Sequence, residues 1–212
     1  MLSKQKLKER LSLKLLIASH NEGKVNEFKS LFQDYDFEIE SLLDYPEMEE
    51  IEETGKTFEE NARLKAETIA QEMGVLVLAD DSGLVVPILN GEPGIYSARY
   101  AGEPTDSEKN MDKLLANLKD VEDDDRVAYF VSCIVLAHPV HESLVVEGRC
   151  YGKIVRERQG EGGFGYDPIF YYSQEGKTFG ELSAQRKNEV SHRAIATTKL
   201  MKALPAWLDE VK

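Results

Sequence analysis

The first apolar run of the chain, Leu13 to Ser19, is followed by a polar loop that contains glycine and then by an amphipathic segment. A short apolar run that ends in polar residues predicts a buried strand. The apolar residues of the next segment recur at the spacing of one helical face: Val25, Phe28, Leu31 and Phe32. Strand, loop and helix in this order open an α/β protein, and this opening restricts the fold class strongly.

Helical and strand patterns alternate through the first half of the chain. Residues 57–74 place apolar side chains near helical spacing and end at Gly74, which suits a helix C-terminus. An apolar run then starts at Val75 and leads into two adjacent aspartates. Residues 107–118 predict another amphipathic helix, with Ser107 as its N-cap.

The second half of the chain is richer in strand patterns. Residues 126–138 are mostly β-branched, apolar or aromatic, which predicts a central strand. Residues 141–155 suit one or two antiparallel strands joined by turns around Gly148 and Gly152. The last helix is expected to begin with Ser191 as its N-cap. Because hairpins follow the alternating units, we expect an α/β fold with a mixed sheet.

Composition limits the partners of the chain. Of its 212 residues 42% are hydrophobic and 31% charged, which fits a globular protein with a substantial core. The formal net charge of −13 argues against nucleic acid and anionic membranes, because both need an attractive field. No apolar run approaches the length of a membrane span. Cys133 and Cys150 lack metal-ligand spacing and predict no disulfide framework, so a reducing cytoplasm fits best.

The start of the chain differs in character from the remainder. Residues 1–13 are basic and lack the continuous apolar stretch of a secretory signal. No repeat, low-complexity segment or linker divides residues 14–212. We therefore expect residues 1–13 to be an N-terminal extension and residues 14–212 to form a single domain.

Two segments of the first half carry candidate site residues. The loop Ser19–Lys24 precedes a helix, where backbone N–H groups attract phosphate and Lys24 adds a positive charge. An ordinary strand-to-helix loop has a similar composition, so this motif is weak evidence on its own. Glu53 lies just before a Thr-Gly turn and could point into a cleft, and Lys65 lies on the helix that comes next.

The adjacent aspartates Asp80 and Asp81 end the apolar run that begins at Val75. Hard cations such as Mg²⁺ take carboxylate oxygens together with phosphate oxygens of a substrate. Successive strand side chains point to opposite faces, so the two aspartates cannot both face one ligand if the strand continues. We expect one of them to be chemical and the other structural, while an Asp-Ser-Gly turn would account for both.

Two later segments carry residues suited to a nucleotide. The stretch GGFGYDPIFYY includes Phe164 and Tyr166, either of which offers a flat face to a nucleobase. A glycine-rich turn between core aromatics would have the same composition. The stretch RKNEVSHR supplies Lys187, His192 and Arg193, the last two at a helix start. Positive groups are disfavoured there by the helix dipole, so a carbonyl-rich or phosphate ligand would compensate them.

Six motifs occur in order between Ser19 and Arg193: SHNEGK, EETGKTFEENA, ADDSGL, PGIYSARYAG, GGFGYDPIF and KNEVSHR. Together they resemble the inosine triphosphate pyrophosphatase family, the noncanonical purine nucleoside triphosphate (XTP/dITP) pyrophosphatases. The resemblance implies an elongated α/β fold of two lobes around a long mixed β-sheet, with a nucleotide cleft between the lobes, and a homodimer. It also implies Mg²⁺-dependent hydrolysis of ITP, dITP and XTP to the monophosphate and pyrophosphate, which cleanses the nucleotide pool.

The resemblance also implies roles for individual residues. Asp81 would be the general base for the water that attacks the α-phosphorus, Glu53 and Asp81 would be the metal ligands, and Asp80 would be support. The substrate would be bound by Ser19, His20, Asn21, Glu22, Gly23, Lys24, Lys65, Ser82, Phe164, Gly165, Tyr166, Asp167, Lys187, His192 and Arg193. Donors from His192 and Arg193 would satisfy the oxygen at C6 of hypoxanthine or xanthine, whereas the amino group of adenine would leave them unpaired.

Two other functions compete with hydrolysis. A noncatalytic nucleotide-binding or sensor protein would retain the same pocket, but the presence of Lys24, Glu53 and Asp81 argues against a loss of hydrolysis. A kinase would be expected to have an acceptor site and a Walker-type or kinase-type glycine-rich loop, and the sequence contains neither pattern.

Overall fold

A single mixed sheet of seven strands organises the molecule. The structure is a computed structural model that describes residues 13–49 and 51–211. In chain order the strands are β1 (Leu13–Ile17), β2 (Phe37–Ser41), β3 (Leu76–Val85), β4 (Val127–Ala137), β5 (Leu144–Ile154), β6 (Phe170–Tyr172) and β7 (Lys177–Thr178). Their order in the sheet is β2-β1-β3-β4-β5-β6-β7. β1 is parallel to both of its neighbours and all later pairs are antiparallel, so the predicted α/β class with a mixed sheet is confirmed.

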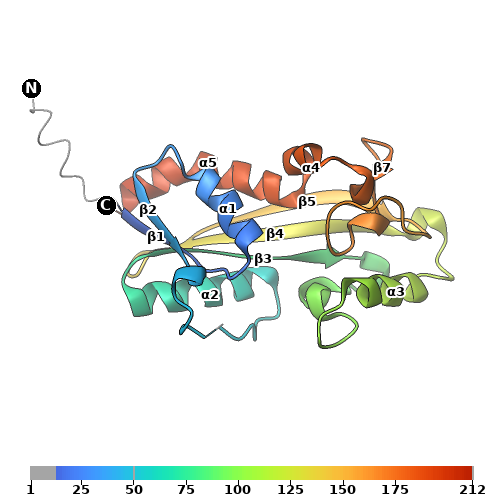
Figure 1. The fold of residues 1–212 in the computed structure, drawn as a ribbon, viewed down its shortest axis with the longest axis horizontal. Coiled ribbons are helices and arrows are strands. Elements are labelled where there is room, and N and C mark those ends of the chain that lie inside the picture. Colours follow the sequence, from blue (N-terminus) through green and yellow to red (C-terminus); the bar gives the residue numbers. More distant parts are fainter. Residues whose placement is uncertain (1–12, 50, 212) are drawn as a thin grey trace, which may run out of the picture.

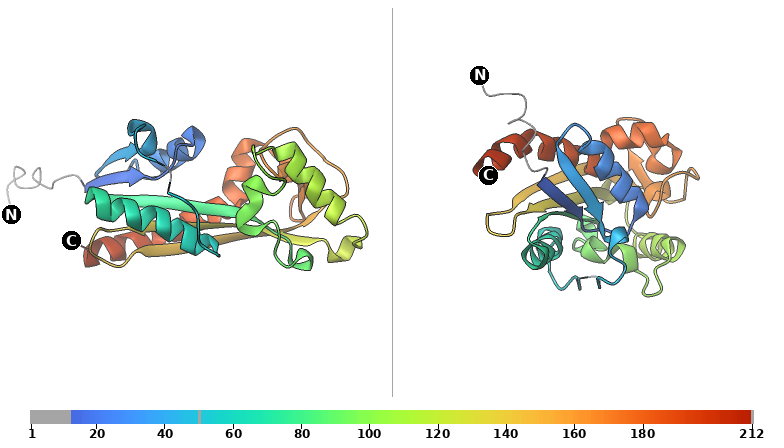
Figure 2. Two further views of the ribbon diagram at one scale, coloured as in Figure 1. Left: turned by 90° about the horizontal axis from the view of Figure 1, so that it is seen from below. Right: turned by 60° about the vertical axis from the view of Figure 1, so that its left-hand side comes forward.

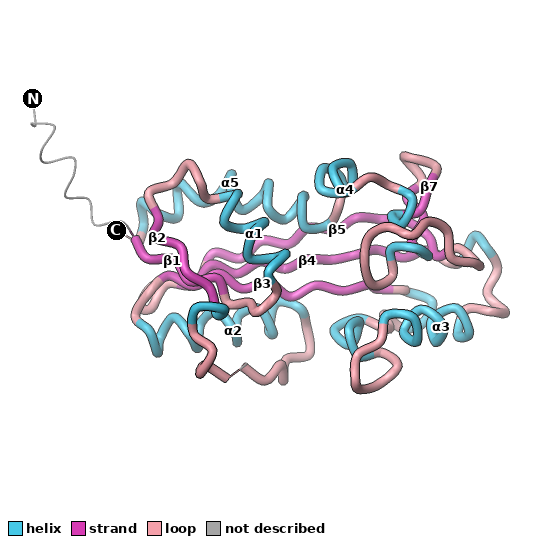
Figure 3. The backbone as a smooth tube through the Cα atoms, in the orientation of Figure 1, coloured by secondary structure: helices cyan, strands magenta, loops and turns pink. Residues whose placement is uncertain are grey.

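Helices connect the strands and cover the sheet. The α-helices are α1 (Glu22–Leu31), α2 (Phe58–Met73), α3 (Ser107–Asn117), α4 (Ala184–Val190) and α5 (His192–Glu210). The short 3₁₀ helices are η1 (Leu42–Asp44), η2 (Pro87–Leu89), η3 (Gly94–Arg99), η4 (Asp123–Asp125), η5 (Asp167–Ile169) and η6 (Phe179–Glu181). β3, β4 and β5 run along the long axis of an elongated molecule (Figures 1 and 3). The further expectation of two lobes with a nucleotide cleft between them stays a prediction.

The side chains of β3 alternate between two cores. Leu76 and Leu78 pack with α1 and α5 on one face of the sheet, whereas Val77 and Ala79 pack with α2 on the other face. Figure 2 shows the sheet between α5 and α2 in this half of the molecule. The same alternation continues into the polar end of β3 and decides where its aspartates point.

Most predicted helix ends are confirmed by their caps. Gly74 ends α2 in the left-handed region with φ 67°, and its N–H donates to the carbonyl of Ala70. Ser191 caps α5 by accepting a hydrogen bond from the N–H of Ala194. The predicted cap of α3 is wrong, because the carboxylate of Asp106 accepts the first free N–H groups and Ser107 is the first residue of the helix.

The predicted turns at Gly148 and Gly152 are also wrong, because both glycines lie inside the continuous strand β5. A Cβ atom on Gly148 would lie 2.2 Å from the carbonyl oxygen of His192 and 2.4 Å from the nitrogen of Ala196. A Cβ atom on Gly152 would lie 2.4 Å from the carbonyl oxygen of Tyr171. The two glycines therefore allow close packing, and Gly148 brings the first turn of α5 directly onto the sheet.

The predicted N-terminal extension, residues 1–13, lies outside the described residues except for Leu13, which begins β1. The extension and the single domain over residues 14–212 stay predictions. Within residues 13–49 and 51–211, no helix has the length and apolar character needed to cross a membrane.

Replacement of Gly148 by alanine is expected to lower the free energy of unfolding by roughly 2–3 kcal/mol, because the added methyl group overpacks the contact between β5 and α5. Urea unfolding measures this change. Lys202→Ala, on an exposed position of α5, is the control and should stay within about 0.5 kcal/mol of the wild type. An equally small change in Gly148→Ala would show that α5 does not rest on β5 at this position.

Candidate active site

The candidate site lies where β1 ends and β3 continues without it. β1 pairs with β3 only as far as Leu78, whose carbonyl accepts a hydrogen bond from the N–H of Ala18 at 2.8 Å. β3 extends to Val85 and keeps its antiparallel pairing with β4 through Asp80 and Asp81. The edge of β3 that faces the loop after β1 is therefore open at the two aspartates.

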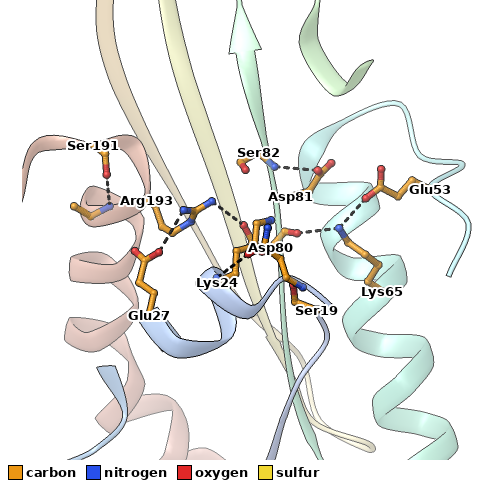
Figure 4. Close-up of polar contacts among 12 residues, drawn as sticks. Ser19, Lys24, Glu27, Glu53, Lys65, Asp80, Asp81, Ser82, Ser191 and Arg193 are labelled. Atoms are coloured by element: carbon orange, nitrogen blue, oxygen red, sulfur yellow. Dashed lines mark hydrogen bonds and ion pairs between the residues drawn. The ribbon is translucent and has the colours of Figure 1, made fainter. Parts of the chain in front are cut away.

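The continuous strand confirms that the two aspartates point to opposite faces. The carboxylate of Asp80 points toward α1 and α5, and that of Asp81 lies on the side of α2 (Figure 4). Both carboxylates are buried. Their surroundings differ, and so do their acidities.

Asp80 holds two cations from different helices. Its Oδ1 accepts a hydrogen bond from Lys24 Nζ of α1 at 2.9 Å, and its Oδ2 lies 3.7 Å from Arg193 Nη2 of α5. Burial alone would raise the pKa of Asp80, but Lys24 and Arg193 outweigh it and hold the pKa below its ordinary value. Asp80 is therefore an ionised carboxylate that positions two cations.

The pKa of Asp81 is shifted in the opposite direction. Its Oδ2 accepts a hydrogen bond from Asn61 Nδ2 at 3.1 Å, and its Oδ1 accepts one from the N–H of Ser82 at 2.9 Å. Burial raises the pKa of Asp81 to about 6, and the carboxylate of Glu53 adds to the effect, although Lys65 opposes it. A carboxylate of this kind can both lose and accept a proton near neutral pH.

Asn61 is a site residue that the sequence patterns did not single out. It is buried on α2, where its Oδ1 accepts a hydrogen bond from the N–H of Gly55 at 2.8 Å while its Nδ2 donates to Asp81. One amide thus ties the loop that carries Glu53 to the second aspartate. Helical spacing could have found it, because Asn61 precedes Lys65 by one turn of the helix.

Glu53 and Lys65 form the ion pair next to the open edge of β3. Lys65 Nζ donates to Glu53 Oε1 at 2.8 Å and to the main-chain carbonyl of Asp80 at 2.9 Å. Arg99 Nη1 lies 3.6 Å from Glu53 Oε2. Burial would raise the pKa of Glu53, but Lys65 and Arg99 outweigh it and lower the pKa below its ordinary value.

A polar pocket of about 630 Å³ opens between these residues. It brings together six of the predicted site residues with Asp80, whereas Asp81, whose carboxylate lies on the α2 side of β3, is not among the lining residues. Its lining residues are Ala18, Ser19, His20, Asn21, Lys24, Leu42, Ile51, Glu52, Glu53, Lys65, Ile69, Asp80, Arg99 and Glu103. The predicted residues Glu22 and Gly23 lie in the first turn of α1, beside the pocket.

Local hydrogen bonds fix the conformation of the loop Ser19–Lys24. Asn21 caps α1, with its Oδ1 accepting the N–H of Lys24 at 3.1 Å. The hydroxyl of Ser19 accepts the N–H of Asn21 at 3.1 Å. These bonds hold the loop at the N-terminus of α1, which is a favourable place for an anion.

A second group of predicted residues surrounds η5. Lys187 pairs with the buried carboxylate of Asp167, and its Nζ lies 4.1 Å from the centre of the Phe164 ring. Phe164 is 65% exposed, whereas Tyr166 is 5% exposed and donates its hydroxyl to the carbonyl of Ser97. Of the two predicted aromatic faces, only Phe164 is therefore open to a ring.

Gly165 explains why these neighbouring aromatics differ. Its φ of 60° lies in the left-handed region, which a glycine adopts without a steric penalty. The backbone reverses there, so that Phe164 faces outward and Tyr166 joins the core. Burial raises the pKa of Asp167 although Lys187 opposes the shift.

The last two predicted site residues, His192 and Arg193, are the first residues of α5. The ring of His192 stacks on Phe130 with centroids 4.9 Å apart, and its buried Nδ1 has no partner among the described residues. Burial lowers the pKa of His192 to about 3, with Arg193 and Lys187 adding to the shift. The imidazole is therefore neutral at physiological pH. Arg193 Nη1 lies 3.3 Å from Glu27 Oε2, and its Nε has no described partner.

Glu53 and Asp81 are the carboxylates that could hold a cation. Within the described parts of the chain, no three His, Cys, Asp or Glu side chains are grouped as a metal site. Mg²⁺ commonly binds through one or two carboxylates and completes its shell with substrate phosphate and water. Burial, with a smaller contribution from the carboxylate of Glu53, raises the pKa of Asp81, and a divalent cation beside Asp81 would favour its ionised form. The donor set therefore fits a metal that arrives with a nucleotide.

Comparison with known proteins gives consistent matches. The model of the Ham1 family matches residues 15–203. The chain is 48% identical over 195 residues to a dITP/XTP pyrophosphatase of Bacillus cereus, covering 91% of this chain and 95% of that protein. It is 50% identical over 194 residues to the dITP/XTP pyrophosphatase of Halalkalibacterium halodurans, covering 92% and 98%.

Solved structures agree with this similarity. The structure of the Staphylococcus aureus Ham1 protein superposes with a TM-score of 0.84 at 45% identity, covering 94% of this chain and 100% of that one. The structure of a HAM1 protein from Coxiella burnetii gives a TM-score of 0.86 at 39% identity, covering 92% and 99%.

Acid is expected to destabilise the protein through His192. The pKa of His192 is about 6.5 in the unfolded chain and about 3 in the folded chain. Between these two pH values, His192 binds a proton in the unfolded state and stays neutral in the folded state. Stability is therefore lost as the pH falls below about 6.5. Between pH 7.5 and 5.5, the wild type should lose about 1.4 kcal/mol more than His192→Gln. Urea unfolding at both pH values measures this difference, and parallel losses in the two proteins would contradict a neutral, buried His192.

Proposed function

The chain belongs to the Ham1 family, and on this premise we propose that it hydrolyses noncanonical purine nucleoside triphosphates. The substrates would be ITP, dITP and XTP, and the products would be the monophosphate and pyrophosphate. The observation that carries the proposal is the pair of opposite-facing aspartates, one fixing cations and the other with a pKa near 6, beside the polar pocket.

Asp81 is the proposed general base. A base works best when its pKa lies near the operating pH, and burial raises the pKa of Asp81 to about 6 before a metal binds. Asp80 is a poorer base, because Lys24 and Arg193 hold its pKa below the ordinary value. A water molecule that attacks the α-phosphorus would give its proton to Asp81.

The leaving pyrophosphate needs positive charge, which the loop and α2 can supply. Lys24 and Lys65 line the pocket with ammonium groups, and the N-terminus of α1 offers further N–H donors. Fixed charges of this kind stabilise the charge that develops in the transition state without reorganisation. Mg²⁺ held by Glu53 and Asp81 would neutralise phosphate oxygens and polarise the phosphorus centre.

Base selectivity is proposed to come from the start of α5. The unpartnered Nδ1 of His192 and Nε of Arg193 are buried polar atoms that a ligand could satisfy. A purine with an oxygen at C6 can accept hydrogen bonds from such donors, whereas adenine would leave them unpaired. Phe164 would stack on the ring, and Lys187 and Asp167 would hold the loop that carries it.

We also propose that the protein is a homodimer. A face of the sheet that we call the tyrosine face, made of Val127, Tyr129, Arg149 and Tyr151, turns apolar and aromatic surface to solvent. Val127 is 42% exposed and Tyr151 60% exposed, and Arg149 lies over the ring of Tyr129. Aromatic residues and arginine are enriched in protein interfaces, so this face suits a second copy of the chain.

The remaining proposals concern the partners of the protein and its cellular location. Its partner would be a small nucleotide and neither nucleic acid nor a membrane, because the net charge of −13 repels polyanions. A reducing, cytoplasmic location is supported by Cys133 and Cys150, which are both buried and free.

The assignment of the reaction is tested by incubating the protein with ITP, XTP, GTP or ATP and Mg²⁺ and resolving the products. We expect monophosphate and pyrophosphate, with ITP and XTP turned over much faster than ATP, because adenine carries an amino group in place of the oxygen at C6. Diphosphate and orthophosphate would exclude attack at the α-phosphorus. Nucleotide binding without turnover would favour the sensor.

The role of Asp81 is tested by Asp81→Asn, which keeps the shape of the side chain but cannot accept the proton. Turnover should fall at least about a hundredfold while ITP binding, measured by calorimetry, is largely retained. Asp124→Asn, on an exposed carboxylate, should leave turnover unchanged. A fully active Asp81→Asn variant would eliminate Asp81 as the base.

The dimer is tested by light scattering coupled to size exclusion. Tyr151→Glu places a charge in the tyrosine face and should shift the protein from dimer to monomer, whereas Asn26→Glu, on an exposed position of α1, should not. A monomeric wild type would disprove the proposed dimer. A Tyr151→Glu variant that remains a dimer would show that the interface does not include the tyrosine face.

A further inference from the structure

We propose that Arg99 is a substrate-binding residue that grips the terminal phosphates of the nucleotide, and hence the pyrophosphate product. The identity of the nucleotide rests on the proposed function, whereas the binding of a polyphosphate by Arg99 does not. Arg99 lies at the end of η3 in the motif PGIYSARYAG.

Arg99 lines the same pocket as the two lysines proposed to bind phosphate. The pocket takes Lys24 from α1, Lys65 from α2 and Arg99 from η3, so three segments of the chain each contribute one cation. The side chain of Arg99 is 31% exposed, which leaves the guanidinium accessible to a ligand. A guanidinium has planar donors that match phosphate oxygens in pairs.

Arg99 is less engaged than the lysines around it. Lys24 lies 2.9 Å from a carboxylate oxygen of Asp80, and Lys65 lies 2.8 Å from one of Glu53. Arg99 Nη1 lies 3.6 Å from the other oxygen of Glu53, which is longer than a normal hydrogen bond. Among the described residues, Glu53 is the carboxylate paired with Arg99, so most of the five N–H donors of its guanidinium remain for a ligand.

Glu53 is shared between two cations of the pocket. It is paired with Lys65 and also faces Arg99. The lining also contains the carboxylates of Glu52, Asp80 and Glu103, so the attraction for phosphate comes from individual cations and their donors and not from a net positive charge of the pocket. A polyphosphate can compete with Glu53 for the guanidinium of Arg99, because phosphate oxygens accept paired charge-assisted hydrogen bonds.

The segment that carries Arg99 is fixed, which favours a binding role over a flexible surface arginine. Ser97 Oγ accepts the N–H of Leu84 at 2.9 Å, and Asn110 Nδ2 donates to the carbonyl of Ala98 at 2.8 Å. A Cβ atom on Gly83 would lie 2.5 Å from Ser97 Oγ, so η3 rests directly on β3 two residues after Asp81. The guanidinium is also placed over the ring of Tyr96, 5.3 Å from its centre.

The competing explanation is that Arg99 only holds Glu53 in place. Both roles would lower turnover when Arg99 is lost, so turnover alone does not separate them. Only direct contact with phosphate makes the affinity for pyrophosphate depend on Arg99 when no metal and no nucleoside are present.

The experiment measures binding of two probes, pyrophosphate and inosine monophosphate, by calorimetry at low salt without divalent metal. Arg99→Ala should weaken pyrophosphate binding about tenfold or more, the scale of one or two charge-assisted hydrogen bonds, and leave the monophosphate within about twofold. Arg99→Lys should recover part of the pyrophosphate affinity. Arg63→Ala, which removes a guanidinium paired with Glu59 and Glu67 on α2, is the matched control and should bind both probes as the wild type does.

Each outcome decides the proposal. Pyrophosphate affinity within about twofold of the wild type in Arg99→Ala, or no measurable binding of pyrophosphate by the wild type, would overturn it. Equal weakening of both probes would also overturn it, because a general disturbance of the pocket would then be the cause. Circular dichroism and thermal unfolding verify that the variants are folded, and Arg99→Gln replaces Arg99→Ala if the latter is not. A wild type that binds pyrophosphate through Arg99 but does not hydrolyse ITP would refute the proposed function and leave this site intact.

Discussion

The buried carboxylate of Asp80 is the interaction on which the arrangement of the site depends. It joins Lys24 of α1 to Arg193 of α5, two helices that pack on the same face of the sheet. An unpaired charge at this depth would be strongly unfavourable, and loss of one partner of a buried pair costs about 3–5 kcal/mol. The ion pairs therefore fix α1 and the loop Ser19–Lys24 that precedes it against the start of α5.

The same strand produces a second carboxylate of opposite character. Asp81 lies one residue further along β3, so its side chain reaches the face covered by α2. There it accepts hydrogen bonds from Asn61 Nδ2 and the N–H of Ser82 and has no direct cation partner among the described residues. Burial then dominates over nearby charge, and the pKa rises to about 6. Two adjacent aspartates thus acquire a positioning role and a proton-accepting character, because a strand turns neighbours to opposite faces.

Glycines and small polar residues give the site its close packing. Gly148 seats the first turn of α5 on β5, and Gly83 seats η3 on β3. Asn61 links the loop of Glu53 to Asp81. These contacts are between segments far apart in the chain, and they place Arg99 in the lining of the pocket and Arg193 beside Asp80. Rigid supports of this kind hold charged groups in the geometry that a transition state requires.

The sequence by itself determined the α/β class, most helix and strand positions, and the division of Asp80 and Asp81 between two faces, because these follow from the periodicity of side chains along the backbone. It did not determine the packing role of Gly148. A glycine in a sequence indicates a turn as readily as a close contact, and the contact with α5 exists only in the folded chain. The sequence also missed Asn61 and Arg99, and it did not distinguish Phe164 from Tyr166. Only the tertiary structure decided which aspartate is ion-paired and which has a raised pKa. The physical reason is that burial and Coulomb interactions come from segments such as α1, α2 and α5, whose distances in space the local pattern of residues does not contain.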